Sequence, residues 1–318
     1  MEIALTDVLA ARQRIAGGVW PTPLLPDAGL AERQGAGVWL KLECWQRTGS
    51  FKVRGAINAI AQLGDDARRR GVLAASAGNH AQGVALAARE AGVSALLVMP
   101  RTASRVKVEA VRRLGAQVRL IGEDYDAAEA AWPAVAAETG RTVVHPFADG
   151  AVIAGQGTVG LEIALAQQAI DVVLIPMGGG GLAVGSAIAL KALLPGVRVY
   201  GVQTETSAPF VASYHAGRHV PVTFEPSIAD GLHGDTTDEM VDLALRHLDG
   251  VFAVSEAAVR RAMRYLYREQ RIVVEGSGAV GVAAVLEGVA PPGRTAIVVS
   301  GRNIAPELFL TVLEEVDA

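Results

Sequence analysis

Cysteine is nearly absent from this chain. Cys44 is the single cysteine among 318 residues, which excludes an internal disulfide. A lone cysteine fits a reducing compartment, and we expect a cytoplasmic location. Residues 1–12 also lack a basic head followed by an apolar block and a small-residue cleavage site, so no secretory signal is predicted.

Long apolar runs without helix breakers are missing as well. Residues 172–190 carry no charge and are long enough to resemble a membrane span, but they contain Pro176 and four consecutive glycines. Because these residues would break a helix in lipid, we interpret the segment as a strand, a glycine loop and a helix inside a protein core. We expect no membrane partner.

Aromatic residues are scarce, and neither sign of charge predominates. The net charge is -4, aromatic side chains make up 5% of the chain, and no long basic run occurs. No nucleic-acid partner is therefore expected. The basic triplet at residues 68–70, directly before Gly71, is typical of a helix C-terminus whose dipole favours cations.

Metal-ligand motifs are also lacking. The six histidines show no tight pairing around cysteines or helical carboxylates. We predict no metal site and interpret four of the histidines as surface or structural residues: His145, His215, His219 and His233.

Apolar residues are abundant, at 51% of the chain, and short β-branched runs alternate with longer alanine-rich amphipathic stretches. This alternation predicts an α/β fold with two open, twisted, mainly parallel sheets flanked by helices and sharing a cleft. We expect residues 1–64 and 147–318 to form a large domain and residues 71–146 a small one. Ligands bind beyond the carboxyl ends of the strands in such sheets.

The same pattern predicts individual elements. We expect strands near residues 72–75, 95–99, 117–121, 142–145, 172–175, 197–202, 251–254 and 296–299. Helices are expected near residues 78–91, 104–114 and 125–138, from Gly157, from Leu182, after Ser255, from Gly278 and at the C-terminus. Residues 221–235 are rich in turn formers and are interpreted as an irregular connection near a site.

Lys52 is the most informative residue, because it stands in the first turn of a predicted helix. Ser50 is the expected N-cap, and apolar residues follow at helical spacing: Val53, Ala56, Ile57, Ile60 and Leu63. The helix dipole and poor solvation both disfavour the charged amine there. A partly neutral amine attacks carbonyls, as an imine with pyridoxal phosphate requires. Considered alone, Lys52 is better described as a surface lysine whose stem covers apolar neighbours, and the segments that follow reverse that preference.

A second segment lies where a predicted strand turns into a helix. It comprises Ser76, Ala77, Gly78, Asn79 and His80. The unpaired backbone N–H groups of a helix N-terminus bind a carboxylate well, since the dipole and the donors point at the anion. An ordinary capped helix start is the alternative.

Four consecutive glycines form the third segment: Gly178, Gly179, Gly180 and Gly181. Glycines between a strand and a helix let backbone N–H groups surround a phosphate. A dinucleotide fingerprint is matched only loosely, because Gln203 stands at the strand end where a ribose-binding acid is required. A smaller phosphate ligand fits better than NAD.

Ser300 defines the fourth segment, at the end of the last apolar strand. Its neutral hydroxyl on a tight turn suits an unprotonated pyridine nitrogen, although simple turn chemistry would also explain a serine there.

Together these segments resemble the serine and threonine dehydratase family, the fold type II pyridoxal phosphate enzymes that also include serine racemase. Residues 41–43 and 48–52 resemble the family's lysine motif, and residues 76–83 its substrate loop. Residues 176–182 are similar to its phosphate loop and residues 228–231 to a later signature. The resemblance covers nearly the whole chain, and the combination in this order is highly specific.

The resemblance implies a role for each matching residue. Lys52 would hold pyridoxal phosphate covalently and then act as base at the substrate α-carbon, with Phe51 packed near the ring. Asn79 would bind the phenolic oxygen of the cofactor, and Ser300 its pyridine nitrogen. Gly178, Gly179, Gly180 and Gly181 would cradle the phosphate. The substrate carboxylate would lie at Ser76, Ala77, Gly78, Asn79 and His80.

The implied reaction is β-elimination of a β-hydroxy amino acid such as L-threonine or L-serine, which gives a 2-oxo acid and ammonia. A homodimer is also implied. Ala77 replaces the serine that racemase-like members use as opposite-face acid, and Gln203 replaces a glutamate that helps them bind a divalent cation. Arg302 replaces a glycine, and we expect it either to point to solvent or to bind an acidic substrate such as 3-hydroxyaspartate.

Two interpretations from other classes remain open. A nucleotide-binding module would use the glycine loop but gives no reason for Phe51, Lys52 or Ser300. A serine hydrolase would treat residues 74–78 as a nucleophile elbow around Ser76, although alanine stands at the first elbow position.

Overall fold

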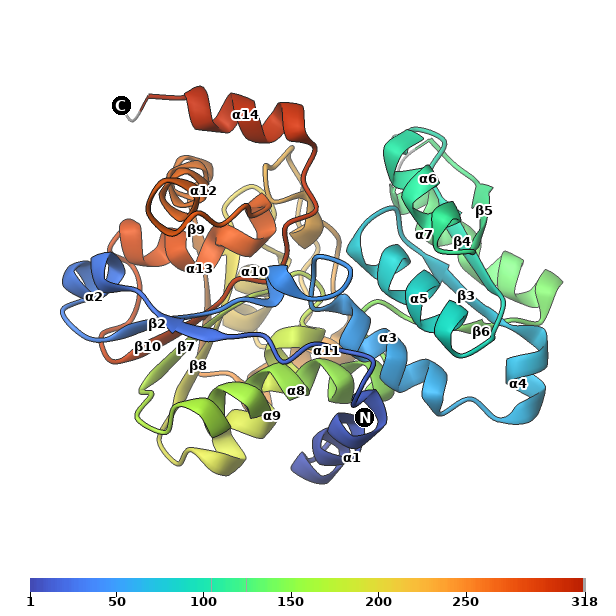
Figure 1. The fold of residues 1–318 in the computed structure, drawn as a ribbon, viewed down its shortest axis with the longest axis horizontal. Coiled ribbons are helices and arrows are strands. Elements are labelled where there is room, and N and C mark those ends of the chain that lie inside the picture. Colours follow the sequence, from blue (N-terminus) through green and yellow to red (C-terminus); the bar gives the residue numbers. More distant parts are fainter. Residues whose placement is uncertain (104, 124, 317–318) are drawn as a thin grey trace.

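Two sheets organise the chain in the computed structural model, which describes residues 1–103, 105–123 and 125–316. The larger sheet has six strands in the order β1-β2-β10-β7-β8-β9, and the smaller has four in the order β5-β4-β3-β6. β1 pairs antiparallel with β2, and the other strand pairs are parallel. The predicted α/β fold with two mainly parallel sheets is confirmed (Figure 1).

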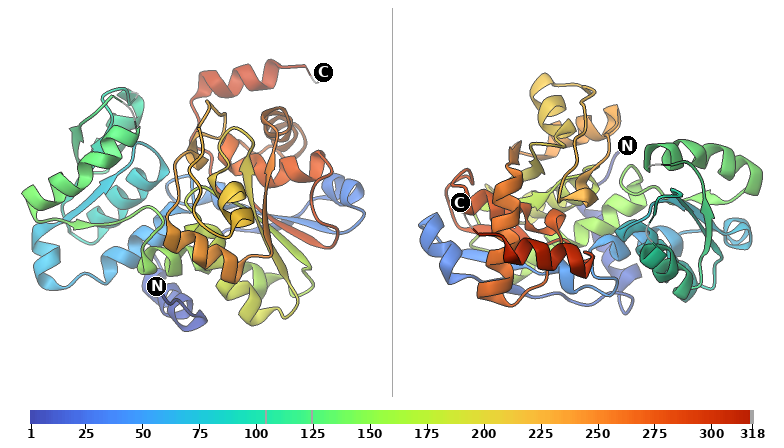
Figure 2. Two further views of the ribbon diagram at one scale, coloured as in Figure 1. Left: turned by 180° about the vertical axis from the view of Figure 1, so that it is seen from behind. Right: turned by 90° about the horizontal axis from the view of Figure 1, so that it is seen from above.

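The strands of the larger sheet are β1 (Leu24–Pro26), β2 (Val38–Lys41), β7 (Val172–Pro176), β8 (Arg198–Thr204), β9 (Gly250–Val254) and β10 (Thr295–Val298). Those of the smaller sheet are β3 (Val72–Ala75), β4 (Ala95–Met99), β5 (Gln117–Leu120) and β6 (Thr142–Val143). Figure 2 shows the smaller sheet and its helices set to one side of the larger sheet.

Helices cover both faces of each sheet. The first half of the chain contains α1 (Leu5–Ile15), α2 (Ala28–Gln34), η1 (Glu43–Trp45), α3 (Lys52–Ala61), α4 (Asp65–Arg70), α5 (Asn79–Glu90), α6 (Arg105–Arg113) and α7 (Tyr125–Thr139). The second half contains α8 (Gly150–Ala166), α9 (Gly181–Leu193), α10 (Pro209–Ala216), η2 (Asp230–Leu232), α11 (Asp238–His247), α12 (Glu256–Gln270), α13 (Gly276–Leu286) and α14 (Pro306–Glu314).

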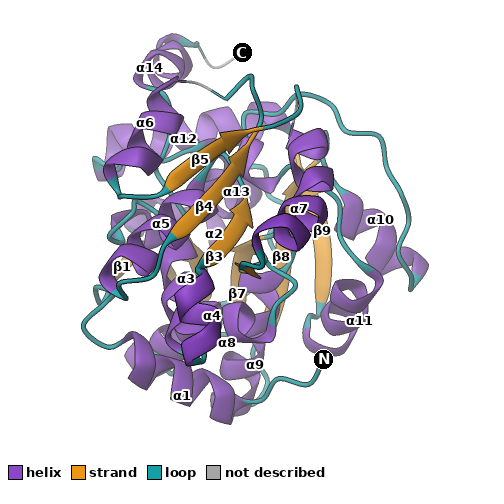
Figure 3. Cartoon of the chain, turned by 90° about the vertical axis from the view of Figure 1, so that its right-hand side faces the viewer, coloured by secondary structure: helices purple, strands orange, loops and turns teal. Residues whose placement is uncertain are grey.

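The alternation of side chains along β7 explains the layers of the larger sheet. Val173 and Ile175 join the core formed with α8 and α9, whereas Val172 and Leu174 join the core formed with α12 and α13. In the smaller sheet, α5 and α6 cover one face and α7 the other (Figure 3). Apolar burial on both faces is what a parallel sheet requires.

The start of α8 was predicted at Gly157, and this prediction is wrong. The helix begins at Gly150, because the side chain of Asp149 caps it by accepting hydrogen bonds from two backbone amides. Its glycines do not break the helix but allow close helix packing. A Cβ at Gly157 would lie 2.7 Å from the carbonyl oxygen of Gly185 on α9.

The predicted N-cap of α3 is also wrong. Phe51 occupies the N-cap position, and the hydroxyl of Ser50 is buried without a hydrogen-bond partner. Ser50 instead forms an isolated antiparallel bridge with Gly301, and Gly49 before it has a φ of 75°. Pairing with the turn after β10 therefore replaces a side-chain cap.

Other local predictions fare better. The basic triplet at residues 68–70 does end a helix, α4, and residues 221–235 are irregular except for η2. The remaining predicted elements are present with shifted ends, and Ser104, where one predicted helix starts, lies outside the described residues. Within the described part of the chain, no helix is long and apolar enough to cross a membrane.

Candidate active site

Lys52 is the first residue of α3, as predicted, and its side chain is half-buried. Its Nζ donates a hydrogen bond to the carbonyl oxygen of Pro146 at 2.9 Å and lies 5.3 Å from the ring centre of Phe51. No ion pair of Lys52 occurs among the described residues. The other three lysines each pair with a carboxylate: Lys41, Lys107 and Lys191.

Burial without a counter-ion lowers the pKa of Lys52 to about 8. The predicted direction is thus correct, and burial is the cause. A noticeable fraction of the amine is neutral near pH 7, and the neutral amine is the nucleophilic form.

The segment after β6 brings several groups to Lys52. Its residues His145, Pro146 and Phe147 lie beside His80, whose Nε2 is 2.8 Å from the carbonyl oxygen of Val144. Burial, reinforced by the nearby Lys52 charge, lowers the pKa of His80 to about 3 and that of His145 to about 4. Both imidazoles are therefore neutral, and His145 Nδ1 accepts hydrogen bonds from the amides of Phe147 and Ala148.

The glycine loop lies against this segment, and at each of its four positions a side chain would clash or strain the backbone. A Cβ at Gly179 would overlap the ring of Phe147, and one at Gly181 would lie 3.1 Å from the Phe147 carbonyl oxygen. A Cβ at Gly178 would lie 3.2 Å from the Cα of Leu232, and Gly180 has a φ of 89°. Since α9 starts at Gly181, the loop ends in the free amides of a helix N-terminus, close to Phe147.

The Ser300 turn is tied to the loop that precedes Lys52. The amide of Phe51 donates to the carbonyl oxygen of Ser300 at 3.2 Å, and the amide of Arg302 donates to that of Gly49 at 2.9 Å. Asn303 Nδ2 donates to the carbonyl oxygen of Thr48 at 2.7 Å. The hydroxyl of Ser300 is buried and makes only a long 3.5 Å contact, to the carbonyl oxygen of Ser277.

Asn79, the first residue of α5, lies at the centre of a row of hydrogen-bonded side chains, between Glu275 and Asn303. Its Nδ2 donates to Glu275 at 2.7 Å, and its Oδ1 accepts from Asn303 Nδ2 at 2.6 Å. Burial raises the pKa of Glu275 to about 7. The amide of Asn79 has two N–H donors, so one remains for a ligand.

The substrate loop before α5 faces the same space. Ser76, Ala77, Gly78 and Asn79 are half-buried, and the Ser76 hydroxyl accepts a hydrogen bond from the Gly78 amide at 3.2 Å. Close packing brings α5 to Lys52, because a Cβ at Gly83 would lie 3.1 Å from the Lys52 carbonyl carbon. All four predicted segments therefore converge on Lys52.

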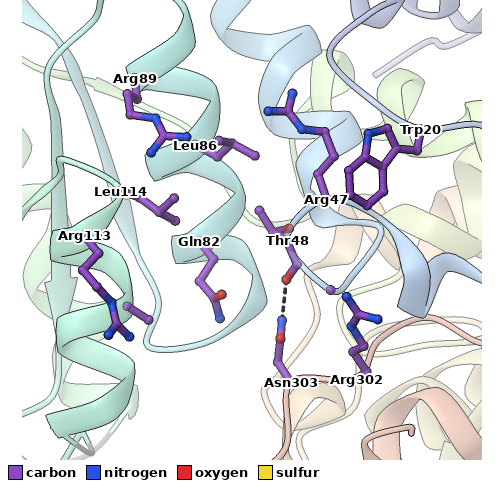
Figure 4. Close-up of a pocket in the computed structure, with 12 residues that line it drawn as sticks. Trp20, Arg47, Thr48, Gln82, Leu86, Arg89, Arg113, Leu114, Arg302 and Asn303 are labelled. Carbon is purple, nitrogen blue, oxygen red and sulfur yellow. Dashed lines mark hydrogen bonds between the residues drawn. The ribbon is translucent and has the colours of Figure 1, made fainter. Parts of the chain in front are cut away.

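Arg302 takes the first of its two expected placements. Its exposed side chain lines a pocket of about 560 Å³ together with Trp20, Arg47 and Gln82 (Figure 4). The lining includes Thr48, Gly49 and Asn303, which belong to the loops beside Lys52, but not Lys52, Ser300 or the four glycines. A contact between Arg302 and an acidic substrate stays a prediction.

The alternatives from other protein classes also lose support. The buried amide of Gln203 binds the carbonyl oxygen of Met177 and the amides of Phe210 and Val211, so it offers nothing to a ribose. A serine hydrolase would need a histidine nitrogen that accepts a hydrogen bond from the Ser76 hydroxyl. His80 does not provide it, because its Nε2 contacts the carbonyl oxygen of Val144 and its Nδ1 has no partner.

Sequence reasoning assigned no role to four residues that lie in the candidate site: Pro146, Phe147, Glu275 and Asn303. His145 was predicted to be a surface or structural residue, and the structural role is correct. A proline and an aromatic residue directly after a strand end were the available signal for Pro146 and Phe147, because ligand sites of parallel sheets lie beyond that end.

The site fits a ligand that carries an aldehyde and a phosphate. The glycine loop packs so closely on Phe147 and Leu232 that no side chain fits on it, and its backbone N–H groups are donors suited to a phosphate. The hydroxyl of Ser277 and the Nδ1 of His80 are buried without partners, and Ser300 is barely engaged. An enclosed, partly neutral amine beside such a cradle defines an enzyme that works through a covalently held, phosphorylated cofactor.

Comparison with known proteins places the chain within that class. A sequence model of the family described as "Pyridoxal-phosphate dependent enzyme" matches residues 15–301. The chain therefore belongs to this family and, within it, to the serine and threonine dehydratases, as predicted, and it is a pyridoxal phosphate-dependent ammonia-lyase.

The relatives are similar over most of their length. The L-threonine ammonia-lyase of Thermotoga maritima is 46% identical over 307 residues, which cover 95% of this chain and 76% of the relative. Maize serine racemase has a TM-score of 0.93 at 33% identity, covering 98% of this chain and 97% of that one. The T.th. threonine deaminase has a TM-score of 0.88 at 41% identity, covering 95% of this chain and 99% of that one.

Proposed function

We propose that this enzyme converts L-threonine to a 2-oxo acid and ammonia and uses L-serine as a second substrate. The proposal depends mainly on one observation: Lys52 has a buried amine, with its pKa lowered to about 8, near the glycine loop. The names of two relatives, an L-threonine ammonia-lyase and a threonine deaminase, support threonine as the substrate.

Pyridoxal phosphate, when bound, supplies an electron-withdrawing ring that acidifies the α-hydrogen of an attached amino acid. Lys52 would hold its aldehyde carbon, Gly178, Gly179, Gly180 and Gly181 its phosphate, Asn79 its phenolic oxygen and Ser300 its pyridine nitrogen. Phe51 would pack beside the ring. The buried hydroxyls without close partners and the glycine loop at a helix N-terminus support these assignments.

Lys52 would then act as the base that removes the α-proton. Its hydrogen bond to the carbonyl oxygen of Pro146 fixes the position of the amine, and its lowered pKa leaves part of it neutral and able to accept a proton near pH 7. The α-proton and the β-hydroxyl leave as water. A second water molecule then replaces the nitrogen, so the products are the 2-oxo acid and ammonia.

The start of α5 would position the substrate carboxylate. Ser76, Ala77, Gly78, Asn79 and His80 surround the N-terminus of a 12-residue helix, whose first amides have no intrahelical partner. His80 stays neutral, because its pKa is about 3, so hydrogen bonds and the helix dipole rather than a cationic side chain would hold the anion.

We also infer the division into domains and the assembly. The smaller sheet lies wholly within residues 72–143, which supports a small domain of residues 71–146 and a large domain of residues 1–64 and 147–318. A homodimer rests on the resemblance to family members, and a cytoplasmic location on the single cysteine. Light scattering on the purified protein tests the dimer.

The cofactor site is tested by reducing the purified protein with borohydride and mapping the pyridoxyl-bearing peptide. The chain has only four lysines, so the label is assigned without ambiguity. We expect Lys52 to carry it. A label elsewhere contradicts the proposed site, and Lys52→Ala should abolish deamination while Lys191→Ala, a change of a surface lysine on α9, should not.

The substrate is tested by measuring ammonia release from L-threonine, L-serine and 3-hydroxyaspartate. We expect threonine to have the highest kcat/KM, and a preference for 3-hydroxyaspartate contradicts the proposal. A chiral assay separates the racemase alternative. Because Ala77 provides no acid on the opposite face of the substrate, we expect racemisation to be much slower than deamination.

A further inference from the structure

A buried cluster of charges lies behind the cofactor lysine, and none of the roles above uses it. We call it the ion cluster; its members are Lys41, Glu43, Arg54 and Glu162. Glu43 and Arg54 are fully buried, Lys41 is 2% exposed and Glu162 is 24% exposed. With two cations and two carboxylates, the cluster is electrically balanced.

Arg54 is the hub of the ion cluster, and all five of its N–H donors are engaged. Nε and Nη2 donate to the two oxygens of Glu43 at 2.7 and 2.8 Å. Nη1 and Nη2 donate to the two oxygens of Glu162 at 2.7 and 2.9 Å, and Nη1 also donates to Thr158 at 3.1 Å. Such a planar fork fixes the guanidinium in both position and orientation.

The cluster joins elements that are far apart in the sequence. Lys41 ends β2, Glu43 starts η1, Arg54 lies on α3, and Glu162 lies on α8. Lys41 completes the connection by donating to Glu162 at 2.5 Å and to the carbonyl oxygen of Thr22 at 2.7 Å. Arg54 therefore fastens α3 to the larger sheet and to α8 at the same time.

Arg54 stands two residues after Lys52, at the opposite side of the same helix. At 100° per residue the two side chains leave α3 about 200° apart, so one faces the cleft and the other the core. The hydroxyl of Ser50 caps nothing, so the start of α3 is held on one side by backbone pairing of residues 50 and 51 with the Ser300 turn. On the opposite side it is held by Arg54.

Packing around Arg54 leaves α3 little room to shift. The backbone amide of Gly55 donates to Gln156 on α8 at 3.1 Å. A Cβ at Gly155 would lie 2.6 Å from the Cα of Gly55. The two helices are in backbone contact at the turn that bears Arg54, so a displacement of Arg54 moves the turn that bears Lys52.

We propose that Arg54 is a positioning residue for the reaction, which holds the first turn of α3 so that the amine of Lys52 stays enclosed beside Pro146. The inference rests on the proposed role of Lys52. Arg54 acts through geometry and not through its charge, because two carboxylates neutralise it and Lys41 balances the cluster. In agreement, burial rather than a neighbouring cation lowers the pKa of Lys52.

The test compares Arg54→Lys, which keeps the charge and loses the fork, with the matched control Arg264→Lys. Arg264 is 6% exposed, pairs with Glu315 at 2.9 Å, and lies on α12. For each variant, the labelling rate of Lys52 by pyridoxal phosphate and borohydride is measured against pH in the cofactor-free protein. The kcat and KM for threonine are measured in the loaded enzyme.

For Arg54→Lys we expect the labelling midpoint to rise from about pH 8 toward the ordinary lysine value of about 10.4. We expect kcat to fall about 10- to 100-fold with a smaller change in KM, because a misplaced reacting group costs this much. Arg264→Lys should lower the thermal midpoint of unfolding without moving either quantity. An unchanged Lys52 midpoint in folded Arg54→Lys overturns the inference.

Glu162→Gln provides a second test in case Arg54→Lys does not fold. Glu162 is partly exposed, so its site should tolerate the change. An uncompensated cation would lower the Lys52 pKa by charge repulsion, whereas a loosened α3 raises it by admitting water. We expect the midpoint to rise, and a fall or no change contradicts the inference. If Lys52 is not labelled in the wild-type protein, the proposed function fails instead, so the two failures are distinguishable.

Discussion

The ring of Phe147 lies so close to Gly179 that a Cβ on the glycine would overlap it. Gly179→Ala should therefore push Phe147 and the glycine loop apart. We expect the dissociation constant for pyridoxal phosphate to rise about 10- to 100-fold, because overpacking of this kind costs about 1–3 kcal/mol. Fluorescence titration of the cofactor-free protein measures the change.

Two further variants control this prediction. A Cβ at Gly64 meets nothing within 4 Å, so Gly64→Ala should leave cofactor affinity unchanged. The double variant Gly179→Ala with Phe147→Ala removes the overlap and should recover part of the affinity. If the single and double variants bind equally, the overlap is not the cause.

The pKa of Lys52 determines how fast the cofactor-free protein takes up pyridoxal phosphate. Only the neutral amine attacks the aldehyde, and burial sets the pKa at about 8. Uptake should accelerate as the pH rises from 6 and level off above about 9. Stopped-flow absorbance measures the rate, and a midpoint near the ordinary lysine value of about 10.4 would contradict the burial of Lys52.

Glu275 should make the cofactor-free protein less stable as the pH rises. Its pKa is raised from 4.5 in the unfolded chain to about 7 in the fold, so the folded state holds a proton that the unfolded state releases. Its contribution is complete below pH 4.5 and is lost through pH 7. The loss is on the order of 3 kcal/mol in the free energy of unfolding.

Urea unfolding of wild type and Glu275→Gln between pH 4.5 and 8 checks this prediction. Glutamine still accepts the hydrogen bond from Asn79 but does not titrate, so the variant should show a shallower fall in stability. Equal slopes for the two proteins would assign the pH dependence to other groups.

Asn303 should matter for stability and for cofactor binding together. Its Nδ2 donates to the Thr48 carbonyl oxygen and to Asn79, so Asn303→Ala leaves both acceptors without this donor. We expect a loss of about 1–3 kcal/mol in the free energy of unfolding and weaker cofactor binding, since Asn79 loses its orientation. Urea unfolding and cofactor titration measure the two effects.

Gln34→Ala is the matched control for Asn303→Ala. Gln34 also donates from a side-chain amide to a distant carbonyl oxygen, that of Pro291 at 2.7 Å, but it lies on α2. Gln34→Ala should lower the free energy of unfolding and leave cofactor affinity unchanged. A similar loss of cofactor affinity in both variants would show a general effect of destabilisation.

Much of this fold was predictable because its signals are local. Alternating β-branched and alanine-rich stretches indicated the parallel sheets, and the positions of Lys52, Asn79 and the four glycines at element starts needed no tertiary information. The start of α8 was predicted seven residues too late, because the cap by Asp149 was not recognised. In the fold, Gly155 and Gly157 serve close packing with α3 and α9, and a pattern in one segment cannot reveal its partner.

The rest of the site depends on tertiary structure. Glu275 gained a raised pKa only through burial, and Asn303 and Pro146 reach the site through turns distant in sequence from Lys52. Ser50 has the residue type of an N-cap, but pairing with Gly301 displaced that role. Competing long-range backbone contacts decided the outcome, and they leave no trace in the local pattern.

The backbone and side-chain links between residues 48–51 and 300–303 connect an early part of the chain with a late one. During synthesis, residues 48–52 leave the ribosome long before the turn that pairs with them. We therefore expect pyridoxal phosphate to be captured late in biogenesis, because a nascent chain that stops before Ser300 carries Lys52 without that turn.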